Sequence, residues 1–221
     1  MCGRYTLAAP AEEIAEVFGL PEAPVMAPRY NIAPTQPVPV VRSGPNGERE
    51  LVELRWGLIP GWLDEPGSGR PLVNARSESA ATRPAFRDAF RWRRCALPAS
   101  GFYEWQRLER GKQPYYVRRK DGRVLALAGL WERWERHGSA IESCTVITVP
   151  PNDDLAWIHD RMPALLPGEA LERWLDPARR QLADLRAMLR PAVAGELEVY
   201  PVSPRVNRAE NDDAECIVPL P

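Results

Sequence analysis

The sequence predicts an α+β fold in a single domain over residues 1–221, with a curled, barrel-like antiparallel sheet as its core and helices at its margins. Three observations lead to this prediction. Short runs rich in aliphatic and aromatic residues recur between turn residues, as in antiparallel sheets. Helical periodicity is confined to one segment near the start and two near the end. No repeat and no long polar linker divides the chain.

The first expected element is a helix over residues 10–20, PAEEIAEVFGL. Pro10 suits a first helical turn, the two glutamates that follow suit the positive end of the helix dipole, and Gly19 suits the stop. The predicted buried stripe consists of Ile14, Val17 and Phe18.

A proline-rich stretch, APVMAPRYNIAPTQPVPVV, follows at residues 23–41. Because proline has no backbone N–H, this composition argues against a helix or a central strand, and we expect an ordered loop or an edge strand. The turn sequence GPNG at 44–47 then predicts a hairpin between the apolar runs at 38–42 and 50–56.

The rest of the chain alternates strands with turns and ends with helices. Strand-like runs occupy residues 95–105, 114–119, 123–134 and 141–150. Asp121 and Gly122 predict a hairpin turn between the second and third of these runs. Helices are expected at 167–175 and 177–190, and a late strand at 197–203.

Composition indicates an ordinary globular protein without a metal or a cofactor. The chain is 44% hydrophobic and 27% charged, and it has no apolar run long enough to span a membrane. Its start lacks the basic and apolar regions of a signal peptide, so we expect a cytoplasmic protein. Four cysteines form no CxxC pair, and two histidines are too few for a usual zinc site. Nothing predicts an obligate oligomer, so we expect a monomer.

Positive charge gathers in the middle of the chain. Between Arg70 and Arg123 there are 14 Lys and Arg against 5 Asp and Glu, although the whole chain has a net charge of −1. Nearly all of these cations are arginines, whose forked guanidinium groups suit phosphates. The segment is consistent with a phosphate-binding face, and equally with a solvated face that acidic neighbours balance in space.

Cys2 directly follows the initiator methionine. Removal of that methionine leaves a thiol and a free α-amine on one Cα, which gives one residue two nucleophiles. An α-amine with a pKa near 8 is partly neutral at physiological pH, and a thiol is readily activated. Cys2 is also compatible with a terminal residue that has no function. By contrast, Cys95 and Cys144 lie in apolar runs and are expected to be buried small residues.

Three further polar residues lie in apolar surroundings. Asn74 follows an apolar run, Glu104 shares a strand face with Phe102, and His159 lies in WIHDRMP. A carboxylate among aromatic side chains should have a raised pKa, as a general acid or base requires. Each residue also has a structural explanation, because the asparagine can cap a turn, the glutamate can face solvent and the histidine can belong to the core.

Seven motifs in order give these residues a common context. MCGR, RYNIAPTQ, WGLIPGW, NARSE, PASGFYEW, AGLW and IHDRMP, followed by PVSPRVN near the end, resemble the SOS response-associated peptidase family, whose members are abasic-site processing proteins. The resemblance covers residues 1 to about 163 and resumes near 201.

The resemblance implies a covalent reaction with damaged DNA. Family members lose the initiator methionine and use the N-terminal cysteine to attack the ring-opened aldehyde of an abasic site in single-stranded DNA, which yields a thiazolidine crosslink. Cys2 matches that nucleophile, and Asn74, Glu104 and His159 match the other site residues. A cytoplasmic protein of this kind would lie at the nucleoid when it is bound to DNA.

Residues that hold the DNA are expected outside this group. Arginines should bind phosphates and aromatic side chains should stack on bases, and the apolar proline stretch is a candidate wedge between bases. The tryptophans among the candidates, Trp62 and Trp105, could equally be core residues. The candidates are Arg4, Arg76 and Arg83 for phosphates, Trp62 and Trp105 for stacking, and Pro39 and Val40 for the wedge.

Two other functions stay open at the level of sequence. Cys2, His159 and Asn74 also match the residue types of a thiol peptidase, in which the thiol attacks a peptide carbonyl. The basic segment alone would suit a non-catalytic binder of single-stranded DNA, with strong salt dependence and no covalent product. A requirement for a free α-amine separates the crosslinking reaction from both.

Overall fold

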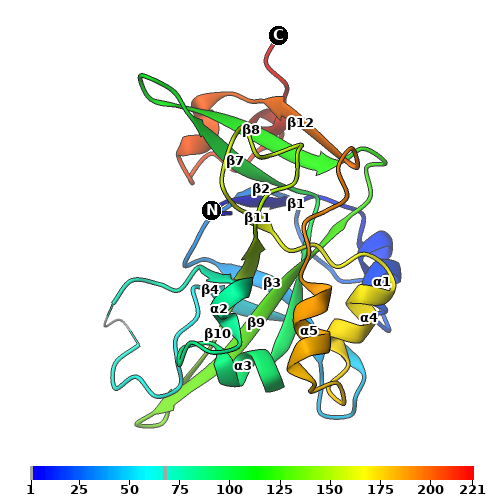
Figure 1. Cartoon of the computed structure of the whole chain (residues 1–221), viewed down its shortest axis with the longest axis vertical. Coiled ribbons are helices and arrows are strands. Elements are labelled where there is room, and N and C mark those ends of the chain that lie inside the picture. The colour runs from blue at the N-terminus through cyan, green and yellow to red at the C-terminus, as the bar shows by residue number, and fades with distance from the viewer. Residues whose placement is uncertain (1, 67–68) are drawn as a thin grey trace.

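The structure is a computed structural model that describes residues 2–66 and 69–221. Within these residues the chain forms two β-sheets with short α-helices at their margins (Figure 1), which confirms the predicted α+β class. The helices are α1 (Ala11–Phe18), α2 (Ser77–Ala80), α3 (Arg87–Trp92), α4 (Glu169–Leu175) and α5 (Leu182–Met188), with 3₁₀ turns η1 (Pro204–Asn207) and η2 (Ala214–Ile217).

One sheet is antiparallel throughout and lies at the top of Figure 1. Its strands, in spatial order, are β12 (Leu197–Pro201), β8 (Lys112–Arg119), β7 (Gly101–Arg107), β1 (Tyr5–Leu7) and β2 (Arg29–Ile32). The hairpin of β7 and β8 projects beyond its neighbours in the same view. The predicted run at 95–105 therefore divides at Ser100, because its second half belongs to this sheet and its first half to the other.

The second sheet closes on itself, which confirms the predicted barrel-like core. Its ring consists of β10 (Ser139–Val149), β4 (Arg49–Trp56), β3 (Pro37–Ser43), β6 (Arg94–Ala99) and β9 (Leu125–Arg136), and β9 pairs back with β10. The short strands β5 (Asn74–Arg76) and β11 (Met162–Pro163) pair with the last residues of β10. The pairs of β10 with β4 and β5 are parallel, unlike the antiparallel pairs we expected.

The proline-rich stretch contains an interior strand, so the expectation of a loop or an edge strand is wrong for part of it. β2 is an edge strand, but β3 lies between β4 and β6. Trp56 N donates to Gln36 O, and the register then directs the hydrogen-bonding groups of even-numbered β3 residues toward β4. Pro37 and Pro39 are odd-numbered, so their missing N–H groups cost no bond to β4. The expected hairpin of β3 and β4 is present.

The turn at Asp121 and Gly122 does not form the predicted hairpin. Gly122 has a φ of 72° and reverses the chain, but β8 and β9 belong to different sheets. The turn residues set the local chain reversal only, whereas the pairing follows from the apolar faces that each strand must bury. The actual hairpin partner of β8 is β7.

The larger of two apolar clusters among the described residues runs through both sheets. It includes Phe102 from the first sheet, Trp56 from the second and Phe18 from α1, all fully buried. Cys95 and Cys144 lie in this core, as predicted. The helix α1 also ends as predicted, because Gly19 adopts the left-handed conformation with a φ of 62°. Within the described ranges, no helix has the length and apolar character that a membrane crossing requires.

Candidate active site

The pairing of four strands brings the sequence-predicted site residues to one region. β1 pairs with β7 through Tyr5 and Phe102, so Cys2 precedes and Glu104 follows two adjacent residues of the first sheet. β5 begins with Asn74 and runs along one edge of β10, while β11, three residues after His159, pairs with β10 at Thr148. Asn74 and the segment after His159 therefore meet at the end of β10, while Cys2 and Glu104 lie beside one another at the first sheet.

Asn74 contacts Cys2 directly. The side-chain amide Nδ2 of Asn74 donates a hydrogen bond of 2.9 Å to the backbone carbonyl of Cys2. Its Oδ1 atom is buried and accepts no hydrogen bond from the described residues. A buried amide oxygen without a donor is costly, so this atom is a candidate acceptor for a hydrogen bond from a substrate or a terminal amine.

The Cys2 side chain is buried, and its environment opposes early ionisation. Burial raises the pKa of the Cys2 thiol well above its usual value, and the carboxylate of Glu104 raises it further. This electrostatic effect requires the thiol and the carboxylate to be close. The thiol therefore keeps its proton until a base removes it.

Glu104 is only 1% exposed, between aromatic strand neighbours. Burial raises the pKa of its carboxyl to about 7, as the sequence predicts for a carboxylate in such surroundings. Asp160 raises the pKa in the same direction through charge repulsion. A carboxyl group with a pKa near neutral pH can both donate and accept a proton under physiological conditions.

His159 is held in a defined tautomer. Burial lowers the pKa of its imidazole, so the neutral ring prevails at neutral pH. The backbone N–H of Arg161 donates to Nδ1 at 3.0 Å, and the proton of the neutral ring then lies on Nε2. Nδ1 is also 2.9 Å from an Asp160 carboxylate oxygen, a contact that favours the charged ring instead. We assign the neutral form, because Asp160 is 79% exposed and its charge is screened by solvent.

The sequence analysis missed an ion pair, between Arg161 and Glu78, that holds this region together. The guanidinium of Arg161 donates to both carboxylate oxygens of Glu78, at 2.7 and 3.0 Å, and also to the backbone carbonyl of Thr148. Arg161 thereby lowers the pKa of Glu78 below its usual value. The signal was present in the motifs NARSE and IHDRMP, because each contributes one member of the pair.

The predicted DNA contacts fall into two groups. In the first group, Arg76, Arg83 and Trp62 have exposed side chains, and Trp62 is 59% exposed. Trp62 and Arg83 line one cavity of about 580 Å³ together with Arg55 and Arg70, above an apolar floor. The guanidinium carbon of Arg83 lies 5.5 Å from the centre of the Phe86 ring. This group combines cations with an aromatic surface.

The second group, Arg4 and Trp105, already forms hydrogen bonds within the protein. Arg4 donates to Asn31 Oδ1 at 2.9 Å and to the backbone carbonyl of Val206 at 2.8 Å, and so attaches the C-terminal segment to β1. Trp105 is half-buried and donates from Nε1 to Asn207 Oδ1 at 2.8 Å. Both bonds reach into the PVSPRVN motif, which explains its structural role.

The wedge prediction is wrong for Val40. This side chain is fully buried in β3, and Val40 pairs with Val52 inside the barrel. A core side chain cannot separate bases, because it would leave a cavity behind. Pro39 is half-buried on the same strand, opposite Glu53, and the strand itself is not a projecting loop.

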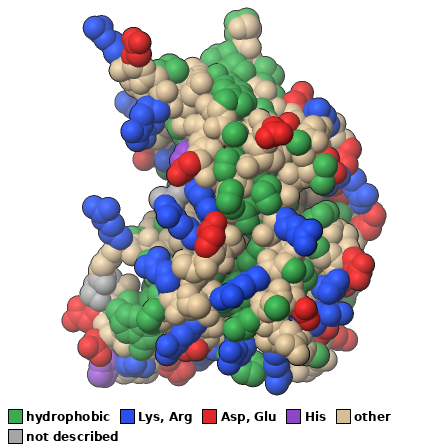
Figure 2. Space-filling model, in the orientation of Figure 1, with side chains coloured by type: hydrophobic (Ala, Val, Ile, Leu, Met, Phe, Trp, Pro, Cys, Tyr) green, Lys and Arg blue, Asp and Glu red, His purple; other side chains and the backbone are tan. Residues whose placement is uncertain are grey.

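The Lys and Arg residues of the basic segment, Arg70 to Arg123, also fall into two groups. Some form ion pairs within the fold, and others are exposed without one in the part of the chain that the structure describes. The members with an ion pair to another element or to a turn carboxylate are Arg93, Arg118, Arg119 and Arg123. Exposed members that form no ion pair with the described residues are Arg70, Arg76, Arg83, Arg91, Arg107, Arg110, Lys112 and Lys120. Figure 2 shows Lys and Arg side chains around a hollow between the β7–β8 hairpin and the segment that joins β4 to β5.

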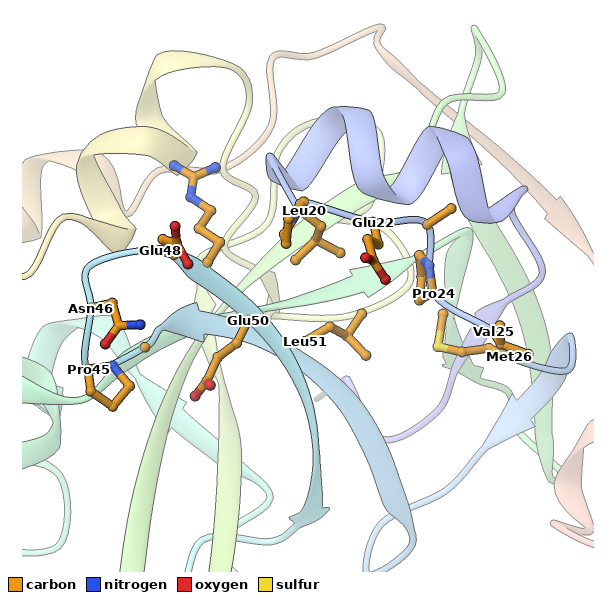
Figure 3. A pocket seen from close by; sticks show the side chains of 14 residues that line it. Leu20, Glu22, Pro24, Val25, Met26, Pro45, Asn46, Glu48, Glu50 and Leu51 are labelled. Carbon is orange, nitrogen blue, oxygen red and sulfur yellow. The ribbon is translucent and has the colours of Figure 1, made fainter.

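A different cavity lies away from these residues. It has a volume of about 590 Å³ between the segment after α1 and the turn of β3 and β4 (Figure 3). Glu22, Glu48 and Glu50 line it beside Arg49. Three carboxylates repel a phosphate backbone, so this cavity does not suit DNA.

Comparison with known proteins finds relatives over nearly the whole chain. A family model described as SOS response associated peptidase (SRAP) matches residues 1–209. The chain is similar to "Abasic site processing protein YoqW" of Bacillus subtilis (strain 168), at 39% identity over 98% of this chain and 99% of that protein. It is also similar to "Abasic site processing protein YedK" of Escherichia coli (strain K12), at 32% identity over the full length of both.

A solved structure shares the fold. The crystal structure of a protein from Bacteroides thetaiotaomicron superposes with a TM-score of 0.87 and 25% sequence identity, and the match covers 99% of this chain and 100% of that one. The matched family model spans nearly the whole chain, including every candidate catalytic residue described above. The chain belongs to the SOS response associated peptidase family.

Proposed function

We propose that the protein processes abasic sites in single-stranded DNA by forming a covalent thiazolidine through Cys2, which shields the lesion during the DNA damage response. The observation that carries the proposal is the contact of Asn74 with the Cys2 carbonyl beside a Glu104 carboxyl whose pKa is about 7. The names of the relatives from Bacillus subtilis and Escherichia coli support the abasic-site role.

The first step uses the α-amine of Cys2 after removal of Met1. An abasic sugar is a hemiacetal in equilibrium with a small amount of open aldehyde, and opening it requires a proton donor and acceptor. The amine adds to the aldehyde carbon, and the resulting carbinolamine loses one water to give an imine. His159, with its proton on Nε2, suits donation to the sugar oxygen that ring opening releases.

The second step closes the ring. The thiol of Cys2 adds across the imine, so that sulfur bonds to the carbon and the thiol proton ends on the nitrogen. Because both nucleophiles belong to one residue, this attack is intramolecular and fast. The raised pKa of the buried thiol keeps it protonated until Glu104, with a pKa of about 7, takes the proton and returns it to nitrogen.

The DNA strand is held by the exposed cations and aromatic surface beside the site. Arg76 follows Asn74 on β5, so a phosphate bound there lies next to the reacting sugar. Trp62 and Arg83 line a common cavity that offers an apolar floor to a base and a guanidinium to its phosphate. These contacts give affinity without reading the sequence.

A peptidase reaction is supported less well by the same residues. A thiol peptidase needs a thiolate paired with an imidazolium, which requires a lowered thiol pKa and a raised histidine pKa. Burial shifts both groups in the opposite directions here, because it raises the pKa of Cys2 and lowers that of His159. The site therefore favours stepwise attack by the amine and then the thiol.

The test is an intact-mass measurement of purified protein mixed with single-stranded DNA that carries one abasic site. The expected product is heat-stable, and its mass equals that of the protein without Met1 plus the DNA minus one water. Cys2→Ala should abolish the thiazolidine, whereas Cys216→Ala, which removes another buried thiol, should retain it. Equal and stable adducts for wild type and Cys2→Ala would refute the proposal.

A further inference from the structure

Trp157 is an exposed aromatic residue beside the active site. It precedes His159 by two residues, and 51% of its surface is exposed. Its Nε1 donates to the backbone carbonyl of Asp154 at 2.9 Å, so its one polar atom is already bonded within the fold. What the side chain presents to solvent is an apolar aromatic ring.

A second aromatic residue fixes the orientation of that ring. Tyr115 of β8 meets Trp157 edge-on, with ring centres 5.0 Å apart and an interplanar angle of 84°. Tyr115 is itself half-buried, and its hydroxyl contacts Gln106 Oε1 at 3.2 Å. The indole is therefore held in place before any ligand arrives, which lowers the entropy cost of stacking on it.

The register of the β7–β8 hairpin places this aromatic pair next to the catalytic groups. Tyr115 lies directly opposite Glu104 in the antiparallel ladder. Residues opposite one another project from the same face of a sheet, with Cβ atoms about 5 Å apart. Tyr115 thus links Trp157 to Glu104, because it contacts the first and lies opposite the second. Trp157 is also only two residues from His159 in the sequence.

The end of the β7–β8 hairpin, near this aromatic pair, carries cations that suit a phosphate. The end of the hairpin carries Arg107, Arg110 and Lys112, all exposed and without ion pairs to the described residues, against the single carboxylate Glu109. Lys112 is near enough to His159 to contribute to lowering its pKa. A phosphate beside a base on Trp157 would meet this positive charge.

We propose that Trp157, braced by Tyr115, is a stacking site for the nucleobase next to the abasic nucleotide. An abasic nucleotide has no base of its own, so its neighbours are the nearest groups on which stacking can act. Stacking on an aromatic side chain is tolerant of sequence, as processing of a random lesion requires. This inference rests on the proposed function.

The test separates binding from covalent capture. Single-stranded DNA with one tetrahydrofuran residue, an abasic analogue without an aldehyde, is titrated in an equilibrium binding assay. Trp157→Ala should weaken binding about 5- to 10-fold, and Trp157→Phe should stay within about twofold of wild type. Trp92→Ala is the matched control, because Trp92 on α3 is also 51% exposed and lies against Arg180 instead. It should bind as wild type does.

Removing one neighbouring base at a time identifies the stacked base. In two further oligonucleotides, the nucleotide on the 5′ or the 3′ side of the analogue is also a tetrahydrofuran. On one of them, wild type and Trp157→Ala should bind equally, because the base that Trp157 contacts is missing. An unchanged affinity of Trp157→Ala, or the same loss on all three oligonucleotides, overturns the inference.

The outcome for the proposed function is read separately. Wild-type protein that binds the analogue but forms no adduct with a true abasic site would refute the crosslinking proposal and leave the stacking site standing. Adduct formation by wild type, with no effect of Trp157→Ala on binding, would support the crosslinking proposal and overturn the stacking inference. Loss of binding by Trp157→Phe as well as Trp157→Ala, despite folded circular dichroism spectra, would mean that indole-specific packing rather than stacking is responsible and would also overturn the inference.

Discussion

Arg161 and Glu78 form a bidentate ion pair, in which the two terminal nitrogens of the arginine donate to the two carboxylate oxygens at 2.7 and 3.0 Å. The pair joins α2, directly after the strand that carries Asn74, to the segment that carries His159. Arg161 also supplies the backbone N–H that holds Nδ1 of His159. The ion pair therefore links the segments that carry two candidate catalytic residues, Asn74 and His159.

Breaking this pair should slow covalent capture more than it destabilises the fold. Glu78→Gln removes the charge but keeps the shape, and we expect crosslinking to slow about 3- to 10-fold as His159 loses its fixed position. Because the Glu78 side chain is half exposed, the cost in unfolding free energy should be about 1 kcal/mol. Single-turnover gels and denaturant unfolding measure the two effects.

A double-mutant cycle distinguishes this positioning role from general loosening. Arg161→Lys removes the same bidentate contact. The double variant Glu78→Gln, Arg161→Lys should therefore capture DNA no more slowly than the slower single variant. Glu198→Gln, which disrupts the exposed pair with Arg118, serves as the control and should capture DNA at the wild-type rate. Fully additive losses would contradict a shared positioning role.

The raised pKa of Glu104 predicts a distinct pH dependence of stability. Burial moves this pKa from 4.5 to about 7, so between these values the folded state holds a proton that the unfolded state has released. The wild-type protein should therefore lose stability as pH rises through this window, by about 3 kcal/mol in all. Glu104→Gln cannot ionise, so it should match wild type near pH 4 and be more stable at pH 8.

Chemical denaturation of both proteins at several pH values checks this sign. Glu109→Gln is the control, because Glu109 is an exposed carboxylate of the same β7–β8 hairpin. It should show the wild-type pH profile throughout. A Glu104→Gln profile that runs parallel to wild type from pH 4 to 8 would mean that Glu104 ionises normally, and it would remove the proton carrier from the proposed mechanism.

Asn74 should be intolerant of a change to aspartate. The amide donates to the Cys2 carbonyl at 2.9 Å, whereas a carboxylate at the same place offers only acceptors and repels that oxygen. We expect Asn74→Asp to slow crosslinking about 10- to 100-fold, in line with the loss of one oriented donor. Rates of adduct formation measured by gel give the comparison. Asn46→Asp, in the exposed turn of β3 and β4, should leave the rate unchanged.

Local chemistry made much of this fold predictable. The helix α1 begins after Pro10 and ends at Gly19 because those two residues favour these positions through their own backbone preferences. Strand alternation could place Glu104 on the same face as Phe102, and the structure shows that both side chains are buried. In such cases the determinants lie within a few residues of one another, where sequence patterns are informative.

Long-range determinants were not predictable in the same way. Whether Pro39 disrupts a strand depends on which neighbour its missing N–H would have faced, and that is known only once β3 is paired with β4. Arg4 resembles a phosphate ligand in isolation, but its acceptors are 27 and 202 residues away in the chain. The stacking partner of Trp157 is likewise on a distant strand.

The two exposed arginines of the site should bind DNA phosphates, and salt dependence can show this without covalent chemistry. Each phosphate contact on a single strand changes the slope of log affinity against log salt concentration by about 0.7. Arg76→Ala and Arg83→Ala should each weaken binding to the tetrahydrofuran oligonucleotide several-fold and reduce the slope by about that amount. Arg118→Ala removes the same charge from a side chain that is already paired with Glu198, so it should change the slope by much less. Equal slopes for wild type and the three variants would show that the exposed arginines do not contact the DNA backbone. The DNA would then have to bind over another face of the protein.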